Sequence, residues 1–294
     1  MRTGMPTIAA TAAMTRRARP TDGEAMKAVV LARGLGTRMR AADEAPALNA
    51  VQAAVADSGV KSLVPLDDDR PFLDYILSAL ADAGCTRICL VIGPDHTLFR
   101  RRYTEVAPPR RFEISFAIQE SPLGTGDAVL AAESFASSDE FLVINSDNYY
   151  PVDVLRSLVA MEGPGTVLFR PEGLAAHSNI EPARILAFGF GRLGADGCLD
   201  SLVEKPDAVE LLAIGSERRV SMNCWRFPPS IFKACRELTP SVRGELELTE
   251  AIMRTIAAGV RFKVLTSDEG VLDLSRRGDI PAVKERLRGV VVRL

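Results

Sequence analysis

The 294-residue sequence contains little histidine, little cysteine and almost no net charge. Its two histidines do not stand at a zinc-like spacing from its five cysteines. Because the cysteines are odd in number and scattered, we expect reduced thiols and a cytoplasmic protein. A formal net charge of -2 gives no overall reason to bind nucleic acid or a membrane surface. No apolar run approaches the roughly 20 residues of a membrane-spanning helix, so no membrane partner is expected.

The first 25 residues lack apolar periodicity and are rich in alanine, threonine and arginine. They are predicted to form a disordered N-terminal tail, although an arginine-rich, acid-poor start also fits an organellar transit peptide. The remaining sequence, with 47% hydrophobic and 25% charged residues over the whole chain, is typical of a globular protein. Since it contains no low-complexity linker, residues 26–294 are predicted to form a single domain.

A short apolar run over residues 28–32 stops at two glycines, Gly34 and Gly36. It has the length and character of a strand buried on both faces, and such strands belong to parallel sheets. The glycines can bring bare backbone N–H groups close to an anion. Positive charge and further donors follow at Thr37, Arg38 and Arg40. The pattern indicates a phosphate-binding loop, with a simple tight turn as the alternative.

Strands then alternate with helices, which predicts an α/β fold with a doubly wound, mostly parallel sheet. The predicted strands of the first half span residues 28–32, 87–93, 112–119 and 141–145, separated by helices over residues 71–83, 96–106 and 126–135. The second half is predicted to continue the sheet with antiparallel strands over residues 166–170, 184–190, 199–204, 220–227 and 261–265, and helices over residues 229–237 and 246–258. Ligands of such sheets lie beyond the carboxyl ends of the strands, which selects residues 33–40, 119–125 and 145–149.

Two aspartates lie at strand ends or within apolar runs. Asp147 follows the strand at residues 141–145 and is suited to Mg²⁺, which takes one or two protein oxygens and completes its shell with phosphate and water. A turn or helix-capping role is the alternative. Asp273 interrupts an apolar run and needs a partner if it is buried. Either it is a second ligand of the same metal, or it forms a salt bridge to Arg276 or Arg277.

Several short motifs appear in a characteristic order. They are Leu31-Ala-Arg-Gly-Leu-Gly-Thr-Arg-Met39, Lys61-Ser-Leu-Val-Pro65, Pro122-Leu-Gly-Thr-Gly126, Val203-Glu-Lys-Pro206, Gly244-Glu-Leu-Glu-Leu-Thr249 and Leu272-Asp273. Together they resemble the signatures of the nucleotidyltransferases that make nucleotide-diphosphate sugars from sugar 1-phosphates. The first, for example, is similar to the family's Leu-Ala-Ala-Gly-x-Gly-Thr-Arg-Met. The resemblance covers about residues 26–290, and the order of the motifs is far more specific than any one of them.

The resemblance implies a Rossmann-like sheet with a small antiparallel substrate lobe, and transfer of a nucleoside monophosphate from a nucleoside triphosphate to a sugar 1-phosphate with Mg²⁺ as cofactor. It implies catalytic roles for Arg38 and Lys61, and magnesium binding by Asp147 and Asp273. The implied nucleotide-binding residues are Ala32, Gly34, Leu35, Gly36, Thr37, Gln119, Gly124 and Thr125. Those implied for the sugar phosphate are Glu204, Lys205 and Asn223.

Some positions depart from the family pattern. Arg33 replaces a small residue, and Ser146 stands where glycine is common. The stretch at residues 41–59 is longer than usual and is predicted to form an extra loop and a short helix that Gly59 stops. Asn223 lies in a strand that matches only loosely. These departures leave the acceptor open, and a cyclitol phosphate or phosphocholine is the nearest variant.

The sequence is also compatible with other hypotheses on the nucleotide, the oligomeric state and the class of protein. UTP is slightly favoured over GTP or dTTP as the nucleotide substrate. A homo-oligomer is compatible with the resemblance, because relatives often form dimers or tetramers. A non-catalytic nucleotide-binding module is the competing class, but it would be expected to have lost Arg38, Lys61 or one aspartate. An NAD-dependent oxidoreductase is disfavoured because the loop has no third glycine opening a helix.

Overall fold

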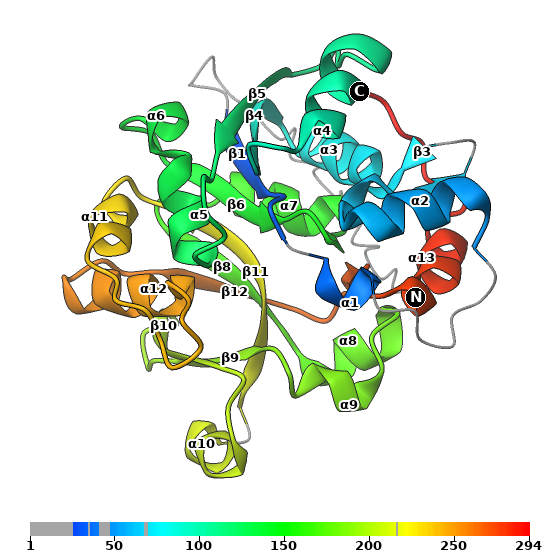
Figure 1. Ribbon diagram of the computed structural model, residues 1–294. Helices are drawn as coiled ribbons and strands as arrows, with labels where there is room; N and C mark the ends of the chain where they lie inside the picture. The colour runs from blue at the N-terminus through cyan, green and yellow to red at the C-terminus, as the bar shows by residue number, and fades with distance from the viewer. Residues whose placement is uncertain (1–25, 35, 41–47, 68–69, 216) are drawn as a thin grey trace, which may run out of the picture.

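The computed structural model describes residues 26–34, 36–40, 48–67, 70–215 and 217–294 (Figure 1). The predicted tail at residues 1–25, Leu35 and the segment at residues 41–47 lie outside the described residues. Among the described helices, none has both the length and the apolar character needed to cross a bilayer. All five cysteines are free thiols, as the sequence indicated.

The first half of the chain builds the parallel part of a nine-stranded sheet. Strand β1 (Met26–Leu31) lies between β6 (Phe141–Asn145) and β4 (Cys85–Ile92), and β5 (Glu113–Ile118) follows β4. All three pairings are parallel. The strand predicted before the glycines is therefore central, and the predicted parallel sheet is confirmed.

The second half adds antiparallel strands beyond β6. Strand β11 (Arg219–Phe227) pairs antiparallel with β6, β8 (Gly165–Phe169) and β9 (Gly189–Leu193). Strand β10 (Leu199–Glu204) pairs antiparallel with β9, and β12 (Lys263–Ser267) pairs parallel with β8. The predicted change from parallel to antiparallel pairing thus falls between β6 and β11.

Helices cover both faces of the sheet (Figure 1). One face packs on α3 (Phe72–Asp82) and α7 (Val152–Val159), and residues of α13 (Ile280–Arg286) belong to the same buried cluster. The other packs on α5 (Thr125–Ala131), α11 (Ile231–Arg236) and α12 (Leu248–Ala257). In β1, Ala28 and Val30 face the first set while Val29 and Leu31 face the second. Burial on both faces explains why this strand is continuously apolar.

Shorter elements connect these layers. They are α1 (Thr37–Arg40), α2 (Ala50–Ser58), η1 (Lys61–Leu63), β2 (Pro65–Asp67), β3 (Arg70–Pro71), α4 (Thr97–Arg101), η2 (Arg102–Val106), α6 (Glu133–Ala136), β7 (Asn148–Tyr149), α8 (Pro171–His177), α9 (Pro182–Ile185), α10 (Ala208–Ile214), β13 (Leu272–Asp273) and η3 (Arg277–Asp279). Helix α2 begins with a capping box between Asn49 and Gln52 and ends at Gly59, whose φ is 79°. The short helix predicted before Gly59 is therefore confirmed.

The predicted strand over residues 184–190 is wrong at its beginning. Residues Pro182–Ile185 form α9, and β9 starts only at Gly189. Proline at the first helical turn has a backbone angle suited to a helix and loses no hydrogen bond there. Pro182 therefore favours the helix, although the residues that follow it are apolar enough for a strand.

Candidate active site

A cavity of about 380 Å³ opens beyond the carboxyl ends of β1 and β6. This is where the strand-end rule places a ligand in an open α/β sheet. Residues from all three selected segments line it together with Lys61 and Ser275. The predicted site residues among its lining are Gly34, Gly36, Thr37, Arg38, Lys61, Gln119, Gly124, Thr125 and Asp147.

The glycine loop forms one wall of this cavity. Gly36 has a φ of 60°, and a Cβ atom there would lie 2.3 Å from the backbone oxygen of Gly59. The loop therefore packs directly against the end of α2, and only glycine fits at position 36. The predicted binding residue Ala32 is buried, donates its N–H to the Val91 oxygen at 2.8 Å, and does not line the cavity.

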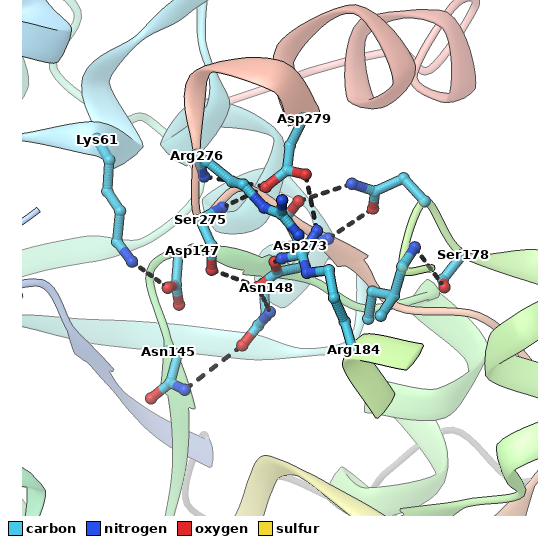
Figure 2. A network of polar contacts seen from close by, with 12 residues as sticks. Lys61, Asn145, Asp147, Asn148, Ser178, Arg184, Asp273, Ser275, Arg276 and Asp279 are labelled. Atoms are coloured by element: carbon cyan, nitrogen blue, oxygen red, sulfur yellow. Dashed lines mark hydrogen bonds and ion pairs between the residues drawn. The ribbon is translucent and has the colours of Figure 1, made fainter. Parts of the chain in front are cut away.

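Lys61 and Asp147 form an ion pair within the cavity (Figure 2). Their side chains are 16% and 18% exposed, so solvent only partly screens the pair. Asp147 lies in the turn after β6, as one alternative predicted. It does not cap the next helix, because the N-cap of α7 is Pro151.

A short ribbon brings the second predicted aspartate to the first. Strands β7 and β13 pair antiparallel, with Asp273 opposite Asn148, and the N–H of Leu274 donates to the Asp147 oxygen at 2.9 Å. Burial raises the pKa of the Asp273 carboxyl to about 6, and the negative charge of Asp147 adds to this increase. Two carboxylates separated by 126 positions in the sequence therefore interact in the folded chain.

Asp273 is 2% exposed and is held by three side chains (Figure 2). Arg184 forms an ion pair with Oδ2 at 2.5 Å, and the Ser275 hydroxyl donates to Oδ1 at 2.9 Å. Asn148 donates its Nδ2 to the same Oδ1 at 3.2 Å. These contacts with Arg184 and Ser275 lower the pKa of Asp273, but they do not outweigh burial.

The predicted alternative for Asp273, a salt bridge to Arg276 or Arg277, is wrong. The cation is Arg184 of α9, which also contacts Asp279 at 2.8 Å. Arg277 instead forms an ion pair with Asp57 at 2.6 Å. Nothing in the sequence pointed to Arg184, because its segment was predicted to be a strand. Ser275 was also missed, although its position two residues after Asp273 is a usable signal.

The loop after β5 forms another part of the cavity wall. Gln119 is buried, and its Nε2 donates to the Gly124 oxygen at 3.0 Å and to Asp127 Oδ2 at 2.8 Å. Gly124 has a φ of 122°, and a Cβ atom there would lie 2.7 Å from the Leu246 nitrogen. Thr125 accepts a hydrogen bond from the Leu248 N–H at 3.2 Å. Glu245, which directly precedes Leu246, also lines the cavity. The motif at residues 244–249 gave this glutamate no predicted role.

The residues predicted for the sugar phosphate do not line this cavity. Glu204 ends β10, where burial raises the pKa of its carboxyl. Lys205 is exposed and has a φ of 48°. Asn223 lies at an irregularity of β11 with a φ of 57°, and its Oδ1 accepts from Trp225 Nε1 at 3.4 Å. Glu204 and Lys205 therefore do not belong to the cavity wall that contains the glycine loop and Lys61, although Glu204 feels the charge of Glu245, which lines the cavity.

Asp147 and Asp273 are the predicted ligands of a metal ion at this site. The described residues contain no group of three or more histidine, cysteine, aspartate or glutamate side chains that could hold one. Mg²⁺ needs only one or two carboxylates when substrate phosphates supply further oxygens. Burial is the main cause of the raised pKa of Asp273, and repulsion by Asp147 is the second; a cation would relieve that repulsion. Asp147, which lines the cavity, fits a magnesium ion that its substrate completes, whereas Asp273 is buried and both of its carboxylate oxygens accept hydrogen bonds from other side chains.

Comparisons with known proteins agree on a family. The nucleotidyl transferase family model matches residues 27–274. The bifunctional protein GlmU of Methanococcus vannielii is 31% identical over 152 residues, which are 52% of this chain and 33% of that protein. The UTP–glucose-1-phosphate uridylyltransferase AglF of Haloferax volcanii is 25% identical over 263 residues, or 90% of this chain and 97% of that protein. The chain spans about a third of the length of its GlmU relatives.

Solved structures share the fold. A UDP-glucose pyrophosphorylase complexed with UDP-glucose superposes with a TM-score of 0.69 at 17% identity, covering 90% of this chain and 99% of the other. A UTP-bound UGPase from Acinetobacter baumannii gives a TM-score of 0.65 at 17% identity, covering 92% and 96%. Because the family model spans the glycine loop, both aspartates and most of the sheet between them, this chain belongs to the nucleotidyl transferase family.

Proposed function

We propose that this chain transfers a nucleoside monophosphate from a nucleoside triphosphate to a sugar 1-phosphate and releases pyrophosphate. The observation that carries the proposal is the single cavity that holds the glycine loop, Arg38 and the Lys61–Asp147 pair together with the loop at Gln119. One wall offers backbone N–H groups and cations to phosphates, and the other offers amide and backbone groups to a base. The name of AglF supports the same reaction class.

In this proposal the triphosphate lies along the glycine loop. The backbone of Gly34 and Gly36 and the side chain of Thr37 donate to its oxygens, and Arg38 faces the pyrophosphate that leaves. Lys61, as a point charge on a flexible stem, contacts the phosphates while it compensates the charge of Asp147. The buried Gln119, held by Gly124 and Asp127, positions the loop that contacts the base.

The chemistry is an in-line displacement at the α-phosphorus. An oxygen of the sugar phosphate forms a new bond to this phosphorus, while the bond to the bridging oxygen of the pyrophosphate breaks and that oxygen takes the electron pair. No covalent intermediate with the protein is needed, so positioning and charge neutralisation supply the acceleration. Three cationic side chains among the described residues line the cavity: Arg33, Arg38 and Lys61. In this proposal Arg38 and Lys61 neutralise the charge of the phosphates.

We assign Asp147 and Asp273 to a magnesium ion that neutralises charge on the phosphates. Asp147 lines the cavity, whereas Asp273 lies behind it and is fixed by Arg184, Ser275 and Asn148. Glu204, Lys205 and Asn223 are assigned to the sugar phosphate by their motifs. UTP is favoured as donor because AglF, whose match covers 90% of this chain, is named for it.

The direct test is a matrix of UTP, dTTP, GTP, ATP and CTP against a panel of sugar 1-phosphates with Mg²⁺, scored by pyrophosphate release. Turnover of one or a few pairs, with UTP among the preferred donors, is expected. Phosphocholine and a cyclitol phosphate belong in the panel as non-sugar acceptors. No turnover with any pair, together with tight nucleotide binding, would contradict the proposal and favour a non-catalytic binding module.

The two substrate sides can be separated with Lys205→Ala. Because Lys205 is exposed and outside the triphosphate cavity, its loss should raise KM for the sugar phosphate about tenfold or more and leave nucleotide binding unchanged. Lys233→Ala, which removes an exposed lysine on α11, serves as the charge control. Weaker triphosphate binding with unchanged sugar phosphate affinity would show that the two sides are reversed.

A further inference from the structure

A second, smaller pocket lies behind the glycine loop. Its volume is about 110 Å³, and Arg33 and Gly34 line both this pocket and the large cavity. Its other walls come from Arg40 and from the loop after β4, which contributes Gly93 and His96. A volume of this size holds a few water molecules, which one tetrahedral oxyanion could replace.

Arg33 forms the wall between the two cavities. Its Nη2 donates to the Glu120 oxygen at 2.9 Å, whereas its Nε is buried and, among the described residues, has no hydrogen-bond partner. The guanidinium lies against Gly93, where a Cβ atom would approach Nε to 3.1 Å. Leaving a buried donor without an acceptor is costly, so a charged acceptor in the pocket would stabilise this guanidinium.

Arg40 brings a second guanidinium to the pocket. Its Nη2 donates to the Ser58 oxygen at 3.0 Å at the end of α2. The side chain passes so close to Gly59 that a Cβ atom there would lie 2.5 Å from Nη2. This packing positions the guanidinium while leaving it exposed and able to donate further hydrogen bonds.

His96 adds a neutral donor. The Gly93 N–H donates to its Nδ1 at 3.2 Å, so the hydrogen of the neutral ring resides on Nε2 and can be donated. Burial and the charge of Arg33 lower the pKa of His96, which keeps the ring neutral at pH 7. Asp95 is exposed and is the one acidic residue among the described residues that line the pocket. Among the lining side chains that the structure describes, two positive charges therefore face one negative charge.

We propose that this pocket is a phosphate-group subsite next to the large cavity. Arg33, Arg40 and His96 would donate to the oxygens of one tetrahedral phosphate. That phosphate is either free inorganic phosphate or the terminal phosphate of a chain that begins in the large cavity. Binding of a terminal phosphate from the large cavity rests on the proposed function, whereas binding of free inorganic phosphate does not.

The test is calorimetric titration of the full chain with inorganic phosphate. The key variants, Arg40→Gln and His96→Ala, change residues that line the small pocket but not the large cavity. Arg101→Gln on α4 is the matched control, because it removes an exposed arginine close in sequence but outside both phosphate pockets. We expect Arg40→Gln to weaken phosphate binding at least tenfold, His96→Ala to weaken it measurably, and Arg101→Gln to leave it unchanged.

A second titration, in the presence of saturating nucleoside triphosphate, distinguishes the two sources. Blocked phosphate binding identifies the terminal phosphate of the nucleotide, and unaffected binding identifies free phosphate as a separate ligand; either result supports the subsite. No binding of phosphate to the unaltered chain, or equal binding in folded Arg40→Gln and His96→Ala, would overturn it. Because the titration needs no turnover, absence of catalysis would contradict the proposed function alone.

Discussion

At the residue scale, the site depends on how one arginine stabilises two buried carboxylates. Arg184 is 14% exposed and contacts Asp273 and Asp279, whose side chains are 3% and 8% exposed. Pairing makes such carboxylates tolerable in the interior, but removing one partner leaves uncompensated charge. Arg184 thereby also fixes Asp273, one of the two aspartates that we assign to magnesium.

Replacement of Arg184 by methionine should therefore destabilise the fold by about 3–5 kcal/mol. The matched control is Arg192→Met, whose pair with Asp200 is 49% and 46% exposed and should contribute about 1 kcal/mol or less. The free energy of unfolding in urea measures both. Equal losses in the two variants would contradict the role given to Arg184.

The raised pKa of Asp273 makes stability depend on pH in a defined direction. In the metal-free protein the pKa of this carboxyl is about 6 when folded, against an ordinary value of 3.8. The contribution of this carboxyl to stability is full below about pH 4 and is lost as pH rises through 6. A difference of about two units corresponds to about 3 kcal/mol.

The isosteric variant Asp273→Asn cannot ionise and should escape this loss. Measured in EDTA, its free energy of unfolding minus that of the unaltered chain should rise between pH 4 and pH 7 by a few kcal/mol. A difference that is flat across this range, or that falls, would show that the buried carboxyl does not titrate in this way.

At the element scale, the loop at residues 119–126 depends on a close backbone approach. Gly124 has a φ of 122°, and an added Cβ would collide with the Leu246 nitrogen at 2.7 Å. Gly124→Ala should therefore displace the loop from the segment before α12, weaken triphosphate binding at least tenfold, and destabilise the fold by about 1–3 kcal/mol.

Gly163→Ala is the control for backbone strain alone. Gly163 also has a positive φ, 79°, but a Cβ there would meet nothing within 4 Å. It should cost about 1 kcal/mol in stability without changing nucleotide affinity measured by titration. If both variants bind the triphosphate equally well, the loop at Gly124 does not form the binding wall.

The elements show what sequence could predict. The buried strand β1, the parallel strands after it and the helix ending at Gly59 follow from local patterns of apolar residues and glycines. Helix α9 was predicted as a strand, because its four residues are too few to show a helical period and only Pro182 marks their start.

The residues of the site also fall into those that the sequence could predict and those that it could not. Its motif residues at the strand ends were predictable and line one cavity. The partner of Asp273 was not, since Arg184 lies 89 positions away and meets it only through the ribbon of β7 and β13 and the turn of α9. Long-range ion pairs of this kind have no local signature. The small pocket at Arg33 likewise depends on three segments that are distant in sequence.

At the scale of the whole molecule, the sheet itself divides the proposed roles. The parallel strands β1, β5 and β6 end at the triphosphate cavity, whereas the residues assigned to the sugar phosphate lie on the antiparallel strands β10 and β11 or directly after them. Asp273 reaches Asp147 from the far end of the chain through β13. We propose that this pair of aspartates, together with Lys61, makes the cavity a catalytic site.

The rate of pyrophosphate release by Asp147→Asn tests that claim most directly, with the best donor and acceptor from the matrix and with Mg²⁺. Asp153→Asn is the matched control, because Asp153 is 90% exposed on α7 and pairs only with Arg156 among the ion pairs of the described residues. We predict that Asp147→Asn lowers kcat about 100-fold or more while the variant still folds, and that Asp153→Asn does not change it. Near-normal pyrophosphate release by Asp147→Asn in Mg²⁺ would contradict the account.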